Sequence, residues 1–291
     1  MDSSPRSSIT GKVKRTPWWM KSLTGWSYVI FEMLFQKMQA RHLKNPLPLP
    51  PLHDVTCIVT GSTSGIGLET ARQLLSLDLI MKWQDERHGT SLLSVEVMEL
   101  NLLSLASVVR FARAWNLRSK PLQVLINNAG IFSMGEPQKF SEDGYETHLQ
   151  VNFLAPALLS VLLLPSIIKG SPSRIINVNS IIHYMGFVDT DDMNFTSGKE
   201  KFNSTKAYSS SKLAQSCSTV SAETPAAPAD EWPTCAYISH DCRPTRAAIE
   251  AHNTRAANEV WEKTLDMIGL PLDAVEKMIQ GEEVMCKYRD S

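Results

Sequence analysis

The sequence lacks several features that would place the chain in a specialised class of protein. Its 29 Lys and Arg residues are balanced by 30 Asp and Glu, for a net charge of −1, so no overall basic charge favours nucleic-acid binding. Its five cysteines are an odd number at irregular spacing, which does not suit a disulfide framework. No second pair of ligands accompanies Cys235 and Cys242, so we expect no metal site.

The chain also lacks a long uninterrupted apolar run. The apolar stretch at residues 18–38 contains Lys21 and Glu32, and its apolar part is shorter than the roughly 20 residues of a spanning helix. It also lacks the small-residue cleavage site of a secretory signal, so we expect an intracellular protein. With 43% hydrophobic and 20% charged residues, the 291-residue chain has the composition of a globular protein with a real core.

Residues 1–45 form a basic and aromatic extension, in which Lys and Arg clearly outnumber Asp and Glu. The tryptophans and tyrosine of 18–38, with basic residues on both sides, favour a helix at a membrane interface. A helix that packs on the folded domain, or on a second copy in a homodimer, explains this pattern equally well. Residues 46–53 contain four prolines and are typical of a stiff linker, so we expect the folded domain to cover 54–291.

A glycine-rich stretch follows the linker. Residues 55–59 are rich in β-branched side chains and predict a buried parallel strand. Gly61, Gly65 and Gly67 then predict a tight turn, and 68–75 has helical composition. Strand, glycine turn and helix form the unit that binds the pyrophosphate of a dinucleotide. The spacing is G-x-x-x-G-x-G and not the general G-x-G-x-x-G, so a purely structural turn remains an alternative.

Further strands and helices alternate along the chain, which predicts an α/β fold with a Rossmann-type, doubly wound parallel sheet. The predicted strands are 93–98, 124–130 and 174–180, and the predicted helices are 104–115, 142–168 and one that begins near 208. Ser104 is the expected N-cap of its helix. A last short strand at 234–238 and helical patterns at 246–268 and 271–279 complete the chain.

Two segments do not fit the doubly wound pattern. A second parallel strand should follow the first within a unit of roughly 30 residues, but 76–81 is a poor strand candidate. The acidic or basic residue that reads the adenosine ribose would stand at that strand's tip, so the choice between NAD and NADP stays open. Another strand is expected after Gln215, where 216–233 reads instead as a loop rich in Ser, Thr, Ala and Pro. We therefore expect an incomplete sheet.

Polar residues suited to proton transfer lie at strand tips and on neighbouring helices. Tyr208 and Lys212 are four residues apart, so they share one face of a helix. An ammonium beside a phenol lowers its pKa, which makes Tyr208 a candidate general acid and base. Ser180 could hydrogen-bond the same substrate oxygen, and Asn152 could hold Lys212 or a water in a proton relay. Each residue alone has a structural explanation, such as a solvated helix face or a satisfied buried backbone group.

Together these motifs resemble the short-chain dehydrogenase/reductase family. The residues that carry the resemblance are Thr60-Gly61-x-x-x-Gly65-Ile66-Gly67, Asn127-Asn128-Ala129-Gly130, Asn152, Ser180 and Tyr208-x-x-x-Lys212. The long interval from Ser180 to Tyr208 and the segment Ile238-x-x-Asp241-Cys242 resemble its retinol-dehydrogenase-like branch, and more closely a plant oxidoreductase of the family. The resemblance implies NAD(P) as the cofactor and hydride transfer to or from a carbonyl or alcohol carbon, with a lipophilic compound as the expected substrate.

The resemblance also implies a role for each matching residue. Tyr208 would be the acid and base, Ser180 would polarise the carbonyl, Lys212 would tune Tyr208 and bind the nicotinamide ribose, and Asn152 would complete the relay. The cofactor-binding residues would be Gly61, Ser62, Ser64, Gly65, Ile66 and Gly67 around the pyrophosphate, Asn128, Ala129 and Gly130 on the adenosine side, Tyr208 and Lys212 at the nicotinamide ribose, and Asn101 at the adenine. Asn101 stands where the family usually has an aspartate.

The sequence departs from the family at the same two places where the fold pattern is incomplete. The second strand is missing between Leu75 and Lys82, and no Pro-Gly pair of the kind that covers the nicotinamide occurs after Lys212. An inactive, shortened isoform that acts as a binding or scaffold protein is therefore the alternative to an active oxidoreductase.

Overall fold

In the computed structural model, residues 18–39, 55–84, 95–199, 201–221, 237–238 and 244–289 are described. Three parallel strands lie at the centre of this part of the chain: β1 (Cys57–Val59), β2 (Val124–Asn127) and β3 (Arg174–Asn177). Their order is β1-β2-β3, with Cys57 opposite Val124 and Val124 opposite Arg174. The predicted strands at 55–59, 124–130 and 174–180 are therefore confirmed.

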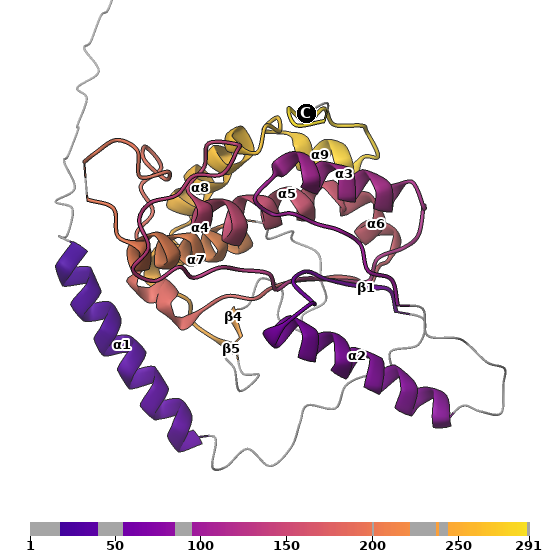
Figure 1. The fold of residues 1–291 in the computed structure, drawn as a ribbon, viewed down its shortest axis with the longest axis horizontal. Coiled ribbons are helices and arrows are strands. Elements are labelled where there is room, and N and C mark those ends of the chain that lie inside the picture. The colour runs from indigo at the N-terminus through magenta and orange to yellow at the C-terminus, as the bar shows by residue number, and fades with distance from the viewer. Residues whose placement is uncertain are drawn as a thin grey trace, which may run out of the picture.

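Helices lie on both sides of this sheet, as the α/β prediction requires (Figure 1). Helix α2 (Gly65–Gln84) lies on one side, and the other side carries α3 (Leu105–Asn116), α5 (Ala155–Leu162) and α6 (Leu164–Lys169). The predicted N-cap of α3 is confirmed, since the Ser104 side chain accepts a hydrogen bond from the Ser107 N–H at 3.2 Å.

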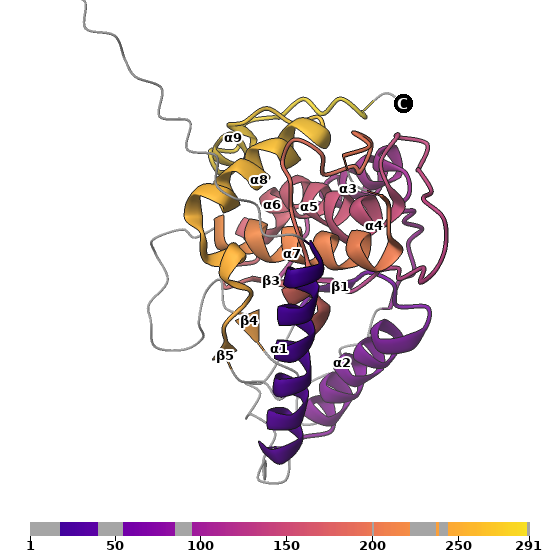
Figure 2. The ribbon, with the colours of Figure 1, turned by 90° about the vertical axis from the view of Figure 1, so that its left-hand side faces the viewer.

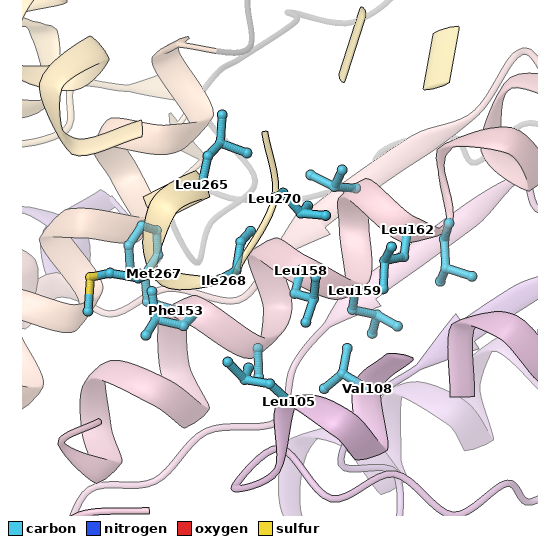
Figure 3. Close-up of a cluster of buried hydrophobic side chains, with 14 of the residues drawn as sticks. Leu105, Val108, Phe153, Leu158, Leu159, Leu162, Leu265, Met267, Ile268 and Leu270 are labelled. Carbon is cyan, nitrogen blue, oxygen red and sulfur yellow. The ribbon is translucent and has the colours of Figure 1, made fainter. Parts of the chain in front are cut away.

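The main hydrophobic core lies on the side of the sheet that carries α3 and α5. Leu105 and Val108 of α3 face Leu158 and Leu159 of α5, and all four side chains are fully buried (Figure 3). The last residues of helix α8 (Thr254–Met267) and the segment after it close the same cluster, through Leu265, Met267, Ile268 and Leu270. This core does not depend on the strands that the sequence lacks.

The long helix predicted at 142–168 is divided into four pieces. It starts five residues later than predicted, with α4 (Thr147–Leu149), where the Glu146 carboxylate accepts from the Leu149 N–H at 3.0 Å. A five-residue π-helix, η2 (Gln150–Leu154), follows and leads into α5. The break between α5 and α6 comes beside a proline in the first turn of α6, because proline cannot donate the hydrogen bond that would continue the helix.

The predicted strand at 93–98 is wrong for the part that the structure describes. Residues 95–100 form no strand, and Val95 and Val97 are 64% and 85% exposed. In the doubly wound order 3-2-1-4-5-6, the third strand pairs only with the second. The candidate for that second strand, 76–81, belongs instead to α2, which continues to Gln84. Among the described residues, the segment 95–100 therefore has no neighbouring strand to pair with.

The second departure from the pattern, after Gln215, is also visible. Helix α7 (Ser204–Ser221) extends six residues into the predicted loop, and 222–233 lies outside the described residues. The predicted last strand corresponds to β4 (Tyr237–Ile238), but β4 pairs in antiparallel fashion with β5 (Pro244–Thr245) and does not join the parallel sheet. The predicted helix at 246–268 is a 3₁₀ turn, η4 (Ile249–His252), followed by α8, and the predicted terminal helix is α9 (Ala274–Ile279).

The predicted N-terminal helix is confirmed as α1 (Trp18–Gln39), which lies along one side of the molecule (Figure 2). It packs against the short 3₁₀ helix η3 (Ile181–Met185), which follows β3. In the part of the chain that the structure describes, no helix is both long and apolar enough to cross a membrane.

Both outer strands of the parallel sheet have a neighbour on one side only within the described residues. On β3, Ile175 is 39% and Ile176 is 46% exposed. Adjacent residues of a strand point to opposite faces, so both faces of β3 are partly uncovered. The expected incomplete sheet is therefore observed, and its open edges can pair with another chain.

We expect these edges to cause concentration-dependent association that Ile175→Lys weakens, because an edge lysine opposes strand pairing between chains. Sedimentation velocity over a concentration series measures this. Ile249→Lys is the matched control, because Ile249 is 87% exposed on η4, outside the sheet. Equal association of the two variants would show that the β3 edge is not the contact.

Candidate active site

The glycine turn is tied directly to the end of the central strand. The buried Thr60 hydroxyl accepts hydrogen bonds from the backbone N–H groups of Asn128 and Ala129, both at 3.0 Å. In return, the Asn128 side-chain amide donates to the Thr60 carbonyl at 3.0 Å. Three hydrogen bonds thus hold the turn after β1 against the C-terminal end of β2, the edge where open α/β sheets bind ligands.

Glycine is required at specific positions of this turn. Gly61 has a φ of +66°, and a Cβ there would lie 2.9 Å from the Ala129 Cα. A Cβ on Gly67 would lie only 2.3 Å from the Gly61 carbonyl oxygen and 2.3 Å from the Asn128 side chain. The N-terminus of α2 at Gly65 is left open to solvent, with Ser64 and Ile66 exposed beside it. These residues fit a pyrophosphate, which binds to N–H groups at a helix N-terminus.

Gly130 connects this turn to the catalytic candidates. A Cβ at Gly130 would lie 3.2 Å from the Asn152 Oδ1 and 3.8 Å from the Lys212 Nζ. The segment Asn128–Ala129–Gly130 therefore runs from the glycine turn to the predicted proton relay. Asn101 precedes α3, and its side-chain oxygen accepts from the Leu103 N–H at 3.0 Å. Its contact with adenine remains a prediction.

Asn152 lies within the π-helix η2 and is fully buried. Its Oδ1 accepts from the Ile131 N–H at 2.8 Å, and its Nδ2 donates to the Ile131 carbonyl at 3.0 Å and to the Ser211 hydroxyl at 3.1 Å. It thus satisfies buried backbone groups and also joins the loop after β2 to α7. Single-turn π-helices occur frequently at functional sites, because they redirect a side chain that a regular helix would place elsewhere.

Lys212 is buried on α7, with 5% of its surface exposed. Its Nζ donates to the Val178 carbonyl at 2.8 Å, just after the end of β3. Burial disfavours the charged ammonium and lowers the pKa of Lys212 to about 8. The Lys212 Nζ thus lies between α7, the end of β3 and Gly130.

Tyr208 precedes Lys212 by one helical turn, and its ring stacks on Phe132 with 4.3 Å between the ring centroids. The ring of the buried His148 lies edge-on to the Tyr208 ring, with 6.2 Å between the ring centroids. The Ser133 N–H donates to the Nε2 of His148, so its Nδ1 carries the proton and donates to Glu146 at 2.8 Å. Sequence analysis missed Phe132 and His148, because neither belongs to a recognisable spacing.

Ser180 follows β3 and is the N-cap of η3, where its hydroxyl oxygen accepts from the Ile182 N–H at 3.3 Å. Asn179, which sequence analysis also missed, links this serine to α7. Its Oδ1 accepts from the Ser180 N–H at 2.7 Å, while its Nδ2 donates to the Lys212 carbonyl at 3.1 Å. All four catalytic candidates therefore belong to one connected region, built from η2, the end of β3 and α7.

The described residues contain no candidate metal centre, because no three of their His, Cys, Asp or Glu side chains gather as metal ligands. Cys235 and Cys242 lie outside the described residues.

Comparison with known proteins defines the class. Residues 55–190 match the sequence profile of the short chain dehydrogenase family. The chain is 49% identical to a dehydrogenase/reductase SDR family member, FEY, of Arabidopsis thaliana, over 98% of this chain and 97% of that protein. The chain therefore belongs to the short-chain dehydrogenase/reductase family, whose members are NAD(P)-dependent oxidoreductases. The predicted resemblance is confirmed, including its plant relative.

The other relatives match over a shorter region. Mouse polyprenol dehydrogenase is 41% identical over 58% of this chain and 54% of its own length, and human retinol dehydrogenase 13 is 37% identical over 55% and 50%. This chain therefore spans about half the length of these two enzymes.

Two comparisons bear on the fold. A crystal structure of an uncharacterised protein from Mycobacterium paratuberculosis superimposes with a TM-score of 0.59 and 25% identity, over 76% of this chain and 95% of that one.

The Arabidopsis match spans 366 aligned positions, whereas this chain has 291 residues, so at least 75 aligned positions have no residue in this chain. A difference of this size agrees with two missing segments.

We expect Lys212→Met to stabilise the folded protein at pH 7 by about 3 kcal/mol, because the variant avoids burying an ammonium whose pKa is lowered to about 8. The folded pKa of about 8 lies below the unfolded value of about 10.4, so the unfolded state binds more protons between these pH values. Wild-type stability therefore rises from pH 8 to 10, and the advantage of the variant shrinks. Urea unfolding of both proteins at pH 7 and pH 10 measures this; an equal advantage at both pH values would contradict it.

Proposed function

We propose that this chain transfers a hydride between a nicotinamide coenzyme and a carbonyl or alcohol substrate. The observation that carries the proposal is the position of Lys212, one turn after Tyr208 on α7. Its carbonyl is linked through Asn179 to Ser180, and its Nζ lies beside Gly130, in the segment that the glycine turn contacts. A general acid, a cation and a hydrogen-bond donor beside a dinucleotide-binding turn suit reduction of a carbonyl group.

The residues that would hold the coenzyme are those of the turn and of the segment after β2. Gly61, Gly65 and Gly67 let backbone approach the pyrophosphate closely, and the N-terminus of α2 favours its negative charge. The coenzyme, when bound, supplies or accepts the hydride. The choice between NAD and NADP stays open, because the strand whose tip reads the ribose is among the segments that this chain lacks.

The proton is handled by the chain itself. Tyr208 would give its phenolic proton to the substrate oxygen, and the nearby Lys212 ammonium would stabilise the phenolate that remains. Since Lys212 has three donors and gives one to Val178, it can also bind the ribose. The Ser180 hydroxyl would donate to the same substrate oxygen as charge develops there. Asn152 would hold the loop and α7 in register for this relay.

A lipophilic substrate is supported by two observations. Polyprenol and retinol appear in the names of the relatives, and α1 carries a row of exposed apolar side chains. These residues are Leu23, Trp26, Ile30, Phe31 and Leu34, each at least 47% exposed. Such a helix can lie on a membrane surface with its apolar face in the lipid. We infer that the protein is intracellular and associates peripherally with membranes. The membrane then supplies the substrate, a lipid-like alcohol or aldehyde.

A second candidate function is an inactive binding or scaffold protein. The open edges of β1 and β3 favour it, because an unpaired strand can add a strand from another chain, including a second copy in a homodimer. Cofactor-dependent turnover by the purified chain discriminates between the two functions.

We expect Tyr208→Phe to lower turnover by at least about 10²-fold, because the ring keeps its packing but loses the transferred proton. Coenzyme affinity should fall far less than turnover, since the phenyl ring keeps the Phe132 stack and Lys212 still binds the nicotinamide ribose. The assay follows nicotinamide absorbance with retinol, a polyprenol and their aldehydes, with coenzyme titration as the control for folding. Unchanged turnover in the variant would exclude Tyr208 as the acid.

A further inference from the structure

Helix α1 packs on the segment that begins with the catalytic serine. A Cβ added to Gly25 would lie 2.8 Å from the Met185 Cγ and 3.0 Å from the Tyr184 carbonyl oxygen, so the α1 backbone lies directly against η3. Val29, one turn later, is 3% exposed. The Tyr28 ring packs on that of Tyr184, with 4.3 Å between the ring centroids. The face of α1 opposite its exposed apolar side chains therefore makes a close contact with η3.

This contact continues to Ser180 through one side chain. The ring of Tyr184 packs on that of the fully buried His183, with 4.1 Å between the ring centroids. The Ala248 N–H donates to the Nε2 of His183 at 3.1 Å, so the proton is on Nδ1. That Nδ1 donates to the Ser180 carbonyl at 2.7 Å. Tyr28, Tyr184, His183 and the Ser180 backbone thus form a continuous row.

We propose that α1 is a positioning element for Ser180, acting through Tyr28, Tyr184 and His183. The proposal rests on the proposed function, in which the Ser180 hydroxyl stabilises charge on the substrate oxygen. Tyr28 and His183 touch no reacting atom in this account; they hold the backbone from which that hydroxyl projects.

The incomplete sheet explains why such support matters here. Ser180 follows β3, which among the described residues is an edge strand whose Ile175 and Ile176 are partly exposed on opposite faces. A loop after such a strand lacks the neighbouring strand that would otherwise hold it. Helix α1 on one side, and Asn179 with α7 on the other, supply that support. Since a misplacement of about 1 Å can cost about 10²-fold in rate, this packing bears directly on turnover.

The test compares Tyr28→Ala with Phe35→Ala in the full chain. Both side chains are aromatic, lie on α1 and are 43% exposed, but Phe35 stacks on Phe31 of the same helix. We expect Tyr28→Ala to lower kcat about tenfold, with coenzyme affinity and substrate KM unchanged, because Ser180 acts in the transition state. Hydrogen exchange at residues 180–186 should become faster. Phe35→Ala should match wild type, and Tyr28→Phe, which keeps the ring, should restore both readouts.

The outcomes separate this proposal from the proposed function. Equal kcat and equal exchange at 180–186 in Tyr28→Ala and Phe35→Ala would overturn the positioning role. Weaker coenzyme binding in Tyr28→Ala would also overturn it, since it would indicate a general loss of structure. If the wild type turns over no substrate, the proposed function fails. Exchange at 180–186 then decides alone: faster exchange only in Tyr28→Ala supports the contact, and unchanged exchange refutes it.

Discussion

The hydrogen bonds of Thr60 to the end of β2 are the interaction on which the rest of the site depends. They hold the glycine turn in place from the central strand, whose residues Leu125 and Ile126 are buried, and they need no contribution from a second strand on the outer side of β1. The same end of β2 leads to Gly130 and, through Ile131, to Asn152. The glycine turn and the residues of the proposed proton relay are therefore both built on one central strand.

The missing segments lie outside this central region. The core between α3, α5 and the end of α8 is closed without them, and the polar contacts of Asn152, Asn179 and Lys212 stay within the loop after β2, the end of β3, η2 and α7. Among the described residues, both edges of the sheet are open and Ser180 lies after an edge strand. Packing of α1 on η3 covers part of the segment that follows this strand.

Features set by local sequence were predictable, and features set by distant partners were not. The glycine turn, the Ser104 cap and the Tyr208–Lys212 face follow from spacing alone, and the structure has all three elements. The segment 93–98 alternates like a strand, but pairing needs a neighbouring strand, and the described residues supply none for 95–98. The orientation of the Asn152 side chain and the tautomer of His183 depend on Ile131 and Ala248, which are distant in sequence. For α1, the sequence left a membrane and a domain contact equally open, and the structure uses one face for the domain while its apolar outer face remains exposed.

The central claim is that the remaining strands still form a coenzyme-binding cleft. Titration of NADPH and of NADH into the purified chain, followed by nicotinamide fluorescence together with thermal unfolding, tests it most directly. The account predicts saturable binding of at least one coenzyme and a melting temperature that rises with its concentration, as expected for a ligand that binds only the folded state. Absence of binding, or unfolding without a cooperative transition, would contradict it and would mean that the two missing segments have dismantled the site.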